Sequence, residues 1–233
     1  GGAFQNVDHD KPSYIARFFE DGNLDDTFMP VFNNNLMNLV IQPDGKVLVG
    51  GQFTEVNGEG QNHIARLDPS GEIDHDFSAS ADDSIVSIAL QADGKMILGG
   101  YFTMINGEPH NRIVRLDSDG NVDISLALDT NGLLVNSVGL QPNGRILIGG
   151  KFTQVNGNDH QNIARLLNNL PATQSLSVAQ GSDDVSISWI LSHASPSAYD
   201  VTFELSTDGT NFTSLGHGDY DLGHWILNEQ DLP

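Results

Sequence analysis

The chain has 233 residues and a formal net charge of −21, with 10 lysines and arginines against 31 aspartates and glutamates. This balance argues against nucleic acid as a partner, because phosphate binding needs clustered cations. The 38% hydrophobic and 18% charged residues are typical of a folded, rather polar protein. The lack of cysteine excludes disulfides, thiol catalysis and cysteine-ligated zinc. No apolar run approaches the ~18 residues that span a bilayer.

A nine-residue motif recurs about every fifty residues, with the consensus Gly-Gly-x-Phe-Thr-x-x-Asn-Gly. It occupies residues 50–58, 99–107 and 149–157, and a degraded copy opens the chain at 1–9. Self-similarity at a period of this size is typical of stacked or radial repeats. Because the chain begins inside a repeat, we expect it to be part of a longer polypeptide.

Residues 35–77 form the type repeat and predict four antiparallel strands. A Pro-Asp-Gly sequence at 43–45 separates the first two apolar runs, and this is a tight-turn signal, since proline sets φ and glycine supplies positive φ. The inner runs are apolar and the outer one is half polar, which indicates a β-propeller blade. A β-solenoid is the rival architecture, but its coils are usually shorter and lack two hairpin turns per repeat. The four runs lie at 36–41, 47–53, 63–67 and 72–77.

An arginine recurs near the end of the third strand of each repeat. Strand alternation directs it toward a neighbouring blade. A half-buried cation needs a carboxylate partner, and the fourth strands offer Asp25, Asp74 and Asp123. We therefore predict a structural brace between blades and not an anion receptor. The arginines are Arg17, Arg66, Arg115 and Arg165.

The second glycine of each Gly-Gly pair is also predicted to be structural. Glycine lets two backbones approach closely where strands crowd near the axis of a propeller. The positions are Gly51, Gly100 and Gly150.

We assign residues 1–168 to about three and a half blades, incomplete at the N-terminus, whereas closed propellers have four to eight. Two complete units lie near 31–79 and 80–128, and the last, 129–167, lacks its fourth strand. The arc is therefore expected to be completed by upstream blades or to pack against other subunits. A missing outer strand is also what a ring closed by an N-terminal strand would show.

Residues 169–233 predict a second, smaller domain. Period-two alternation at 175–178, 185–190 and 201–206 indicates half-buried strands. We expect a small β-sandwich of immunoglobulin or fibronectin type III character, truncated at its end, with Trp189 in its core. The fold class predicted for the whole chain is thus all-β, a partial propeller followed by a sandwich.

The repeat resembles a known family. The run Leu-Gln-Pro-Asp-Gly-Lys-Ile-Leu-Val-Gly-Gly-x-Phe-Thr-x-Val-Asn-Gly, followed by Ile-Ala-Arg-Leu and Asp-Gly, is similar to bacterial delta-60 repeats, a β-propeller domain of unknown function. The likeness is clearest at 39–77, 88–126 and 138–166. It implies a large secreted or surface-attached bacterial protein and brings no catalytic residues. The tail resembles a segment that often follows such repeats.

One turn is a candidate calcium site. Alternating oxygen ligands around a glycine turn suit a hard cation. The equivalent turns lack the full ligand set and no glutamate follows at EF-hand spacing, so an ordinary β-turn is the other interpretation. No other cofactor is predicted. The candidate ligands are Asp117, Asp119, Asn121 and Asp123.

Each repeat also carries a histidine in its Asn-Gly loop, at His9, His63, His110 and His160. We interpret these as surface histidines and not as a converging metal site. No nucleophile motif of the Gly-x-Ser-x-Gly type and no His-Glu-x-x-His motif is present. We therefore predict no catalytic residues.

These observations favour a non-enzymatic scaffold, extracellular or at the bacterial cell surface, that acts in adhesion or as a subunit of a larger assembly. Its expected partners are proteins or further copies of itself. The alternative is a ligand-binding or enzymatic propeller whose site, at the mouth of the central channel, is built partly by missing blades. A third hypothesis is a calcium-stiffened linker in an adhesin.

Overall fold

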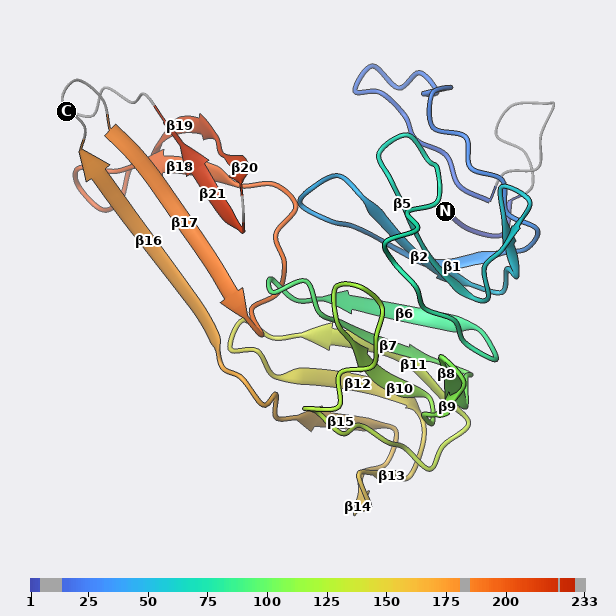
Figure 1. Ribbon diagram of the computed structural model, residues 1–233. Helices are drawn as coiled ribbons and strands as arrows, with labels where there is room; N and C mark the ends of the chain where they lie inside the picture. Colours follow the sequence, from blue (N-terminus) through green and yellow to red (C-terminus); the bar gives the residue numbers. More distant parts are fainter. Residues whose placement is uncertain (5–13, 181–184, 222, 229–233) are drawn as a thin grey trace.

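The computed structural model describes residues 1–4, 14–180, 185–221 and 223–228, and every regular element in these residues is a β-strand (Figure 1). No helix suited by length and apolar character to crossing a membrane occurs in the described residues. The predicted all-β class, with a partial propeller and a smaller C-terminal domain of two sheets, is confirmed.

Three antiparallel sheets of three strands follow one another along the chain, and we call them the first, second and third blades (Figure 1). In each, the hairpin predicted from the first turn is present: Gly45 has a φ of 82° and donates its N–H to Gln42 O at 2.9 Å. The strands are β1 (Leu36–Ile41), β2 (Val47–Gly51) and β5 (Ile64–Leu67) in the first blade, β6 (Ile85–Leu90), β7 (Met96–Gly100) and β10 (Ile113–Leu116) in the second, and β11 (Leu134–Leu140), β12 (Ile146–Lys151) and β15 (Ile163–Leu166) in the third.

The fourth strand is shorter than predicted, because only single bridges, Leu67 to Ile73 and Leu116 to Val122, continue the first and second sheets. The reason is the aspartate that comes next. Asp74 accepts the N–H of Asp76 with Oδ1 at 3.0 Å and that of Phe77 with its carbonyl at 3.1 Å, so the chain turns away from the sheet.

A small hairpin, which the sequence pattern did not predict, is built on each Asn-Gly loop. Asn57 and Gly58 have φ angles of 52° and 84°, as the two central residues of a type I′ turn require. The hairpins are β3 (Glu55–Val56) with β4 (Glu59–Gly60), β8 (Met104–Ile105) with β9 (Glu108–Pro109), and β13 (Gln154–Val155) with β14 (Asn158–Asp159).

Hydrophobic cores lie between successive blades. Strand β6 contacts β1 and β2 of the blade before it and β11 of the blade after it. Leu48 and Ile64 of the first blade are fully buried in a core with Ile85 and Leu116 of the second. Burying one such side chain contributes about 1.5–3 kcal/mol, so each blade depends on its neighbour for cover.

The C-terminal domain contains a four-stranded and a two-stranded sheet. Its core is centred on Trp225, which is 6% exposed, and the predicted core residue Trp189 packs against it only partly buried. A relation to fibronectin or immunoglobulin domains stays a prediction. The strands are β16 (Ala172–Gln180), β17 (Val185–His193), β21 (His224–Leu227) and β20 (Asp219–Asp221), with β18 (Thr202–Leu205) and β19 (Thr213–His217) in the smaller sheet.

The second blade holds the C-terminal domain through its first turn. Ala92 donates its N–H to Ser195 O at 2.8 Å, and Ser197 donates to Leu90 O at 3.0 Å. The other two blades have proline at the position of Ala92, Pro43 and Pro142. Proline has no N–H, so the alanine supplies the donor that this junction needs.

Candidate functional site

The recurring arginine braces two blades, as the sequence predicts. Arg66 Nε and Lys46 Nζ lie 2.7 and 2.8 Å from Asp74 Oδ2, and Arg66 Nη1 donates to Ser118 O of the next blade at 2.6 Å. Burial raises the pKa of Asp74, but the hydrogen bonds from Lys46 and Arg66 outweigh it and lower that pKa to about 2. The carboxylate is therefore ionised at neutral pH and forms ion pairs with two cations.

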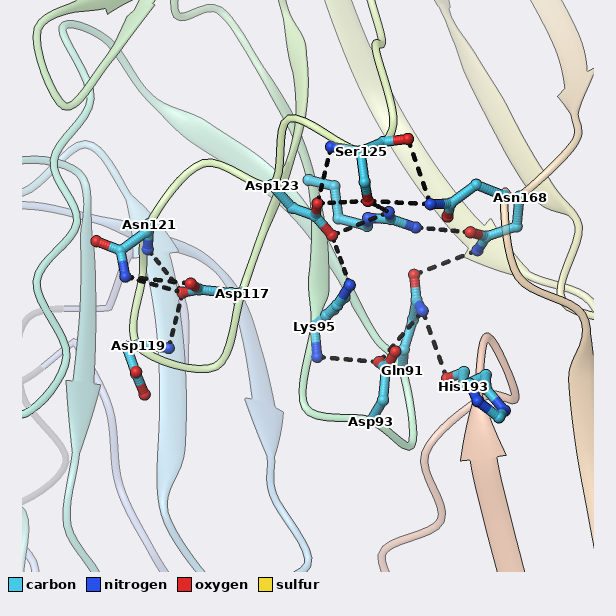
Figure 2. Close-up of polar contacts among 12 residues, drawn as sticks. Gln91, Asp93, Lys95, Asp117, Asp119, Asn121, Asp123, Ser125, Asn168 and His193 are labelled. Atoms are coloured by element: carbon cyan, nitrogen blue, oxygen red, sulfur yellow. Dashed lines mark hydrogen bonds and ion pairs between the residues drawn. The ribbon is translucent and has the colours of Figure 1, made fainter.

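The same brace recurs in the second blade (Figure 2). Arg115 Nη2 and Lys95 Nζ lie 2.9 and 2.7 Å from Asp123 Oδ2, and Arg115 is 1% exposed. Arg115 Nη1 donates to Asn168 Oδ1 at 2.6 Å, so a side-chain oxygen replaces the backbone carbonyl used one blade earlier. In the N-terminal unit, defined as residues 1–4 and 14–28, Arg17 pairs with Asp25 at 2.6 Å.

The third blade lacks this brace, contrary to the prediction for Arg165. Arg165 is exposed, Arg145 is half-buried, and neither has a carboxylate partner among the described residues. The reason is the change of sequence after β15. Thr173, already in β16, stands where the two complete blades have aspartate.

The repeated glycines allow close approach of two backbone segments, and the repeated asparagines form hydrogen bonds with backbone groups. A Cβ on Gly51, Gly100 or Gly150 would collide with a carbonyl oxygen of the adjacent strand or its flank, in agreement with the predicted close approach. Asn57 Oδ1 accepts the N–H of Val31 at 2.8 Å, and the same side chain donates to Gly71 O at 3.2 Å. The loop is thereby tied to the turns on either side of it.

The structure does not assemble the four candidate calcium ligands into one site. Asp117 Oδ1 accepts the backbone N–H groups of Asp119 and Asn121 at 3.0 and 2.8 Å, so it closes its own turn (Figure 2). Asp123 lies apart, against Lys95. Among the described residues, no group of three or more His, Cys, Asp or Glu is placed to hold a metal ion.

The loop histidines that the structure describes fall at two repeat positions. His110 and His160 correspond, and their backbone N–H groups donate to Thr103 O and Thr153 O at 2.8 and 2.9 Å, whereas His63 lies at another position. His63 has a φ of 66° and its Nδ1 lies 3.1 Å from Gly51 O, beside its own blade. Arg112 and Asn162 occupy the same repeat position with φ angles of 66° and 65°, so this backbone turn does not depend on histidine. His9 lies outside the described residues.

The third blade has an apolar face without cover. In the first two blades, the face directed at the following blade is buried: Ile64 and Ile113 are fully inaccessible. Their counterpart in the third blade, Ile163, is 68% exposed. Leu147, the counterpart of the fully buried Leu48 and Ile97, is 37% exposed. A Cβ on Gly99 would lie 2.7 Å from Val135 of the next blade, whereas on Gly149 it would meet nothing closer than 3.9 Å.

This face also carries an unused hydrogen-bond acceptor. Asn38 Oδ1 of the first blade accepts the N–H of Ile88 of the second at 3.2 Å, and Ser87 Oγ accepts that of Val138 at 3.0 Å. The counterpart in the third blade, Ser137, is exposed, and its hydroxyl has no partner within the described part of the chain. We call this surface the open face; it consists of Ser137, Leu147, Gly149, Ile163 and Arg165.

Of the open-face residues, only Arg165 was assigned a role from the sequence, and that role was a brace between blades. The amino-acid sequence around these exposed residues does not distinguish them from their buried counterparts, since Ile-Ala-Arg-Leu is identical at 64–67 and 163–166. The available signal was the incomplete last unit, which predicted an open arc. The side chains that such an arc leaves exposed are identified by comparing the exposure of equivalent residues in the three blades.

Three segments match a family model described as "Domain of unknown function (DUF5122) beta-propeller", at residues 42–77, 91–125 and 141–170. Each segment begins at or next to the first turn of a blade and extends past its third strand. A search of curated proteins found no match. The repeat region thus contains β-propeller repeats of a domain whose activity is not known, and the C-terminal domain lies beyond the matched segments.

Proposed function

We propose that this chain is a non-enzymatic scaffold of the bacterial exterior, secreted or at the cell surface, and that the open face is where it contacts other proteins. One observation carries the proposal: Leu147 and Ile163 are exposed at positions that are buried twice elsewhere in the same chain. An exposed apolar surface whose counterparts are buried against a neighbouring blade is typical of an interaction surface.

The use of the charged side chains supports a scaffold over an enzyme. Arg66, Arg115, Asp74 and Asp123 are engaged with each other or with neighbouring turns. Perturbed carboxylates often mark active sites, but the lowered pKa of Asp74 has a structural cause in its two cationic neighbours. The net charge of −21 supports an exterior location, because it keeps a protein soluble in salty surroundings.

The open face has the composition expected of the centre of an interface. Two aliphatic side chains flank a glycine, which admits close approach, and a hydroxyl and a guanidinium lie beside them. Interfaces combine an apolar centre with polar groups and are enriched in arginine. A stable partner is expected to bury more than ~1,000 Å² in total.

The test is capture from the extracellular fraction of the source organism, with the immobilised wild-type chain, Ile163→Glu, and Ile124→Glu as the control. Ile124 is 91% exposed and lies outside the open face. We expect the wild type and Ile124→Glu to retain the same protein, identified by mass spectrometry, and Ile163→Glu to lose it. Capture of no protein, or equal capture by all three, would contradict the proposal.

A further inference from the structure

We propose that the cleft between the first two blades and the C-terminal domain binds a small aliphatic diamine, with one ammonium group held between Gln42 and Asp44. The cleft is lined by the first turns of both blades and by Ser197 and Tyr220 of the C-terminal domain. Its volume of about 90 Å³ is several times the ~10–15 Å³ that one water molecule needs. Ligand sites occur preferentially where domains meet. The site shares no residue with the open face and is additional to the proposed function.

Gln42 supplies a hydrogen-bond acceptor to the cleft. The residue is 8% exposed, and its Oε1 is buried without a hydrogen-bond partner among the described residues. Gln91 occupies the same position in the second blade, and its Oε1 accepts Asn168 Nδ2 at 3.3 Å. A buried acceptor that lacks a donor is costly. The side chain of Gln42 therefore favours a ligand that donates a hydrogen bond inside the cleft.

The cleft also carries negative charge. The exposed carboxylate of Asp44 lines it, and none of the described residues that line it is a lysine, arginine or histidine. Asp44 accepts the N–H of Lys46 in its own turn, with Oδ1 at 3.2 Å, and this leaves Oδ2 available to a ligand. Burial and the charge of Asp44 raise the pKa of the Tyr220 phenol, so the carboxylate acts across the cleft on the C-terminal domain. A positively charged donor is therefore favoured over an uncharged one.

The rest of the lining suits an aliphatic chain. Pro43, Leu90 and Ala92 contribute apolar groups, against which methylene groups pack with loss of water from both surfaces. Tyr220 lies on the opposite side, in the C-terminal domain, and aromatic rings attract cations. An amine on a methylene chain matches both kinds of group.

A wider hollow next to the cleft provides a place for a second ammonium group. The two share Pro43 and Asp44. The hollow is also lined by Glu20, Asp200 and His217. His217 Nδ1 lies 3.0 Å from Asp200 Oδ1, so any positive charge on this histidine is offset by its own partner. The remaining carboxylates keep the hollow negative, and a diamine therefore fits the two spaces better than a monoamine.

Isothermal titration calorimetry of the full chain with putrescine, at physiological ionic strength, tests the proposal. The diol of the same chain length is the uncharged probe. Asp44→Asn removes the charge and keeps the turn, because Asn143 has this position in the third blade and accepts the N–H of Arg145 at 3.2 Å. Gln42→Leu removes the buried acceptor. We expect the wild type to bind one putrescine and no diol, and each variant to bind putrescine at least tenfold more weakly.

Two controls separate a built site from the general attraction of a cation to an acidic chain. Asp26→Asn removes the same charge at an exposed position outside the cleft. Gln141→Leu replaces the glutamine of the third blade, whose Oε1 is also buried without a partner but does not line the cleft. Both are expected to bind putrescine as the wild type does. The proposal is overturned by a wild type without saturable binding, by equal binding of the diol, or by equal affinities of Asp44→Asn and Asp26→Asn.

Discussion

Asp74 and Asp123 each pair with an arginine and a lysine in the region where two blades meet. Arg115 is 1% exposed, and a buried guanidinium of this kind is tolerated only with its partners in place. The same arginine position is exposed and unbraced in the third blade. The arginine at this repeat position is therefore a buried, paired residue in the second blade and an exposed, unpaired residue in the third. The difference depends on whether a carboxylate and a further blade follow it in the chain.

Replacement of Arg115 by alanine is expected to lower the free energy of unfolding by about 3 kcal/mol, because it breaks a buried ion pair and the bond to Asn168. The matched control is Arg165→Ala, which should change it by less than ~0.5 kcal/mol, as surface substitutions usually do. Urea denaturation followed by circular dichroism measures both. Equal effects of the two variants would disprove the distinction.

Asp74 contributes to the acid dependence of stability, together with other carboxylates whose pKa is lowered, among them Asp123. The pKa of Asp74 is about 2 in the folded protein and ~3.9 in an unfolded chain. A folded-state pKa below the unfolded one contributes stability that is complete above the unfolded pKa and is lost as the pH falls toward the folded one.

We therefore expect the free energy of unfolding to fall between about pH 4 and pH 2, and to fall less steeply in Asp74→Asn than in the wild type. Denaturant titrations at a series of pH values measure the two slopes. Asp26→Asn, at an exposed aspartate, serves as the control and should retain the wild-type slope. A steeper or unchanged slope in Asp74→Asn would refute the assignment.

At the scale of elements, the blades differ in the side chain that follows the bracing aspartate, which is aromatic in some repeats and aliphatic in another. Phe28 and Phe77 lie under the guanidiniums of Arg17 and Arg66, with ring centroids 4.6 and 5.0 Å away. The residue at the same repeat position in the second blade is Leu126, and it lines a groove together with Asp123 and Leu128.

Leu126→Phe is expected to stabilise the second blade by about 1 kcal/mol, because the ring fills the groove and meets the guanidinium face. The complementary variant Phe77→Leu should destabilise the first blade by a similar amount. Calorimetric melting temperatures of the two variants provide the measurement. A lower melting temperature for Leu126→Phe would show that the groove does not accommodate an aromatic ring.

The junction with the C-terminal domain depends on a backbone donor. Ala92→Pro removes the N–H that Ser195 accepts, at a cost of about 1 kcal/mol. The blade itself should tolerate proline, since Pro43 and Pro142 occupy the equivalent turns.

We expect Ala92→Pro to increase the rate of limited proteolysis between the third blade and β16, with little change in the melting of the blades. Pro142→Ala is the control and should leave that rate unchanged. An unaltered rate in Ala92→Pro would show that the hydrogen bond does not hold the two domains together.

At the scale of the molecule, repetition made much of the fold predictable. The hairpin turns and the Gly-Gly approaches arise from patterns that recur in each blade, and the Arg–Asp pairs from a pattern that recurs in the N-terminal unit and the first two blades, so the copies support one another. The exceptions arise where one copy departs from the rest. Ala92 replaces a proline, and Thr173 replaces an aspartate. Such single-copy differences act through tertiary contacts, which a one-dimensional pattern does not contain.

The open face is the clearest example of this difference between pattern and context. Ile64 and Ile163 belong to the same tetrapeptide, yet one is fully buried and the other 68% exposed. Exposure here is a property of position in the stack, since the third blade has no successor within the described residues. The function proposed for the molecule comes from that position and not from a motif.

Carbene footprinting read by mass spectrometry tests the central claim most directly, because it reports the accessibility of individual side chains when a partner binds. We expect labelling of Ile163 and Leu147 to fall together when the captured extracellular protein is added, while labelling of Ile124, exposed and outside the open face, stays constant. Constant labelling of Ile163 and Leu147 in the complex would contradict the account, because the partner would then use another surface.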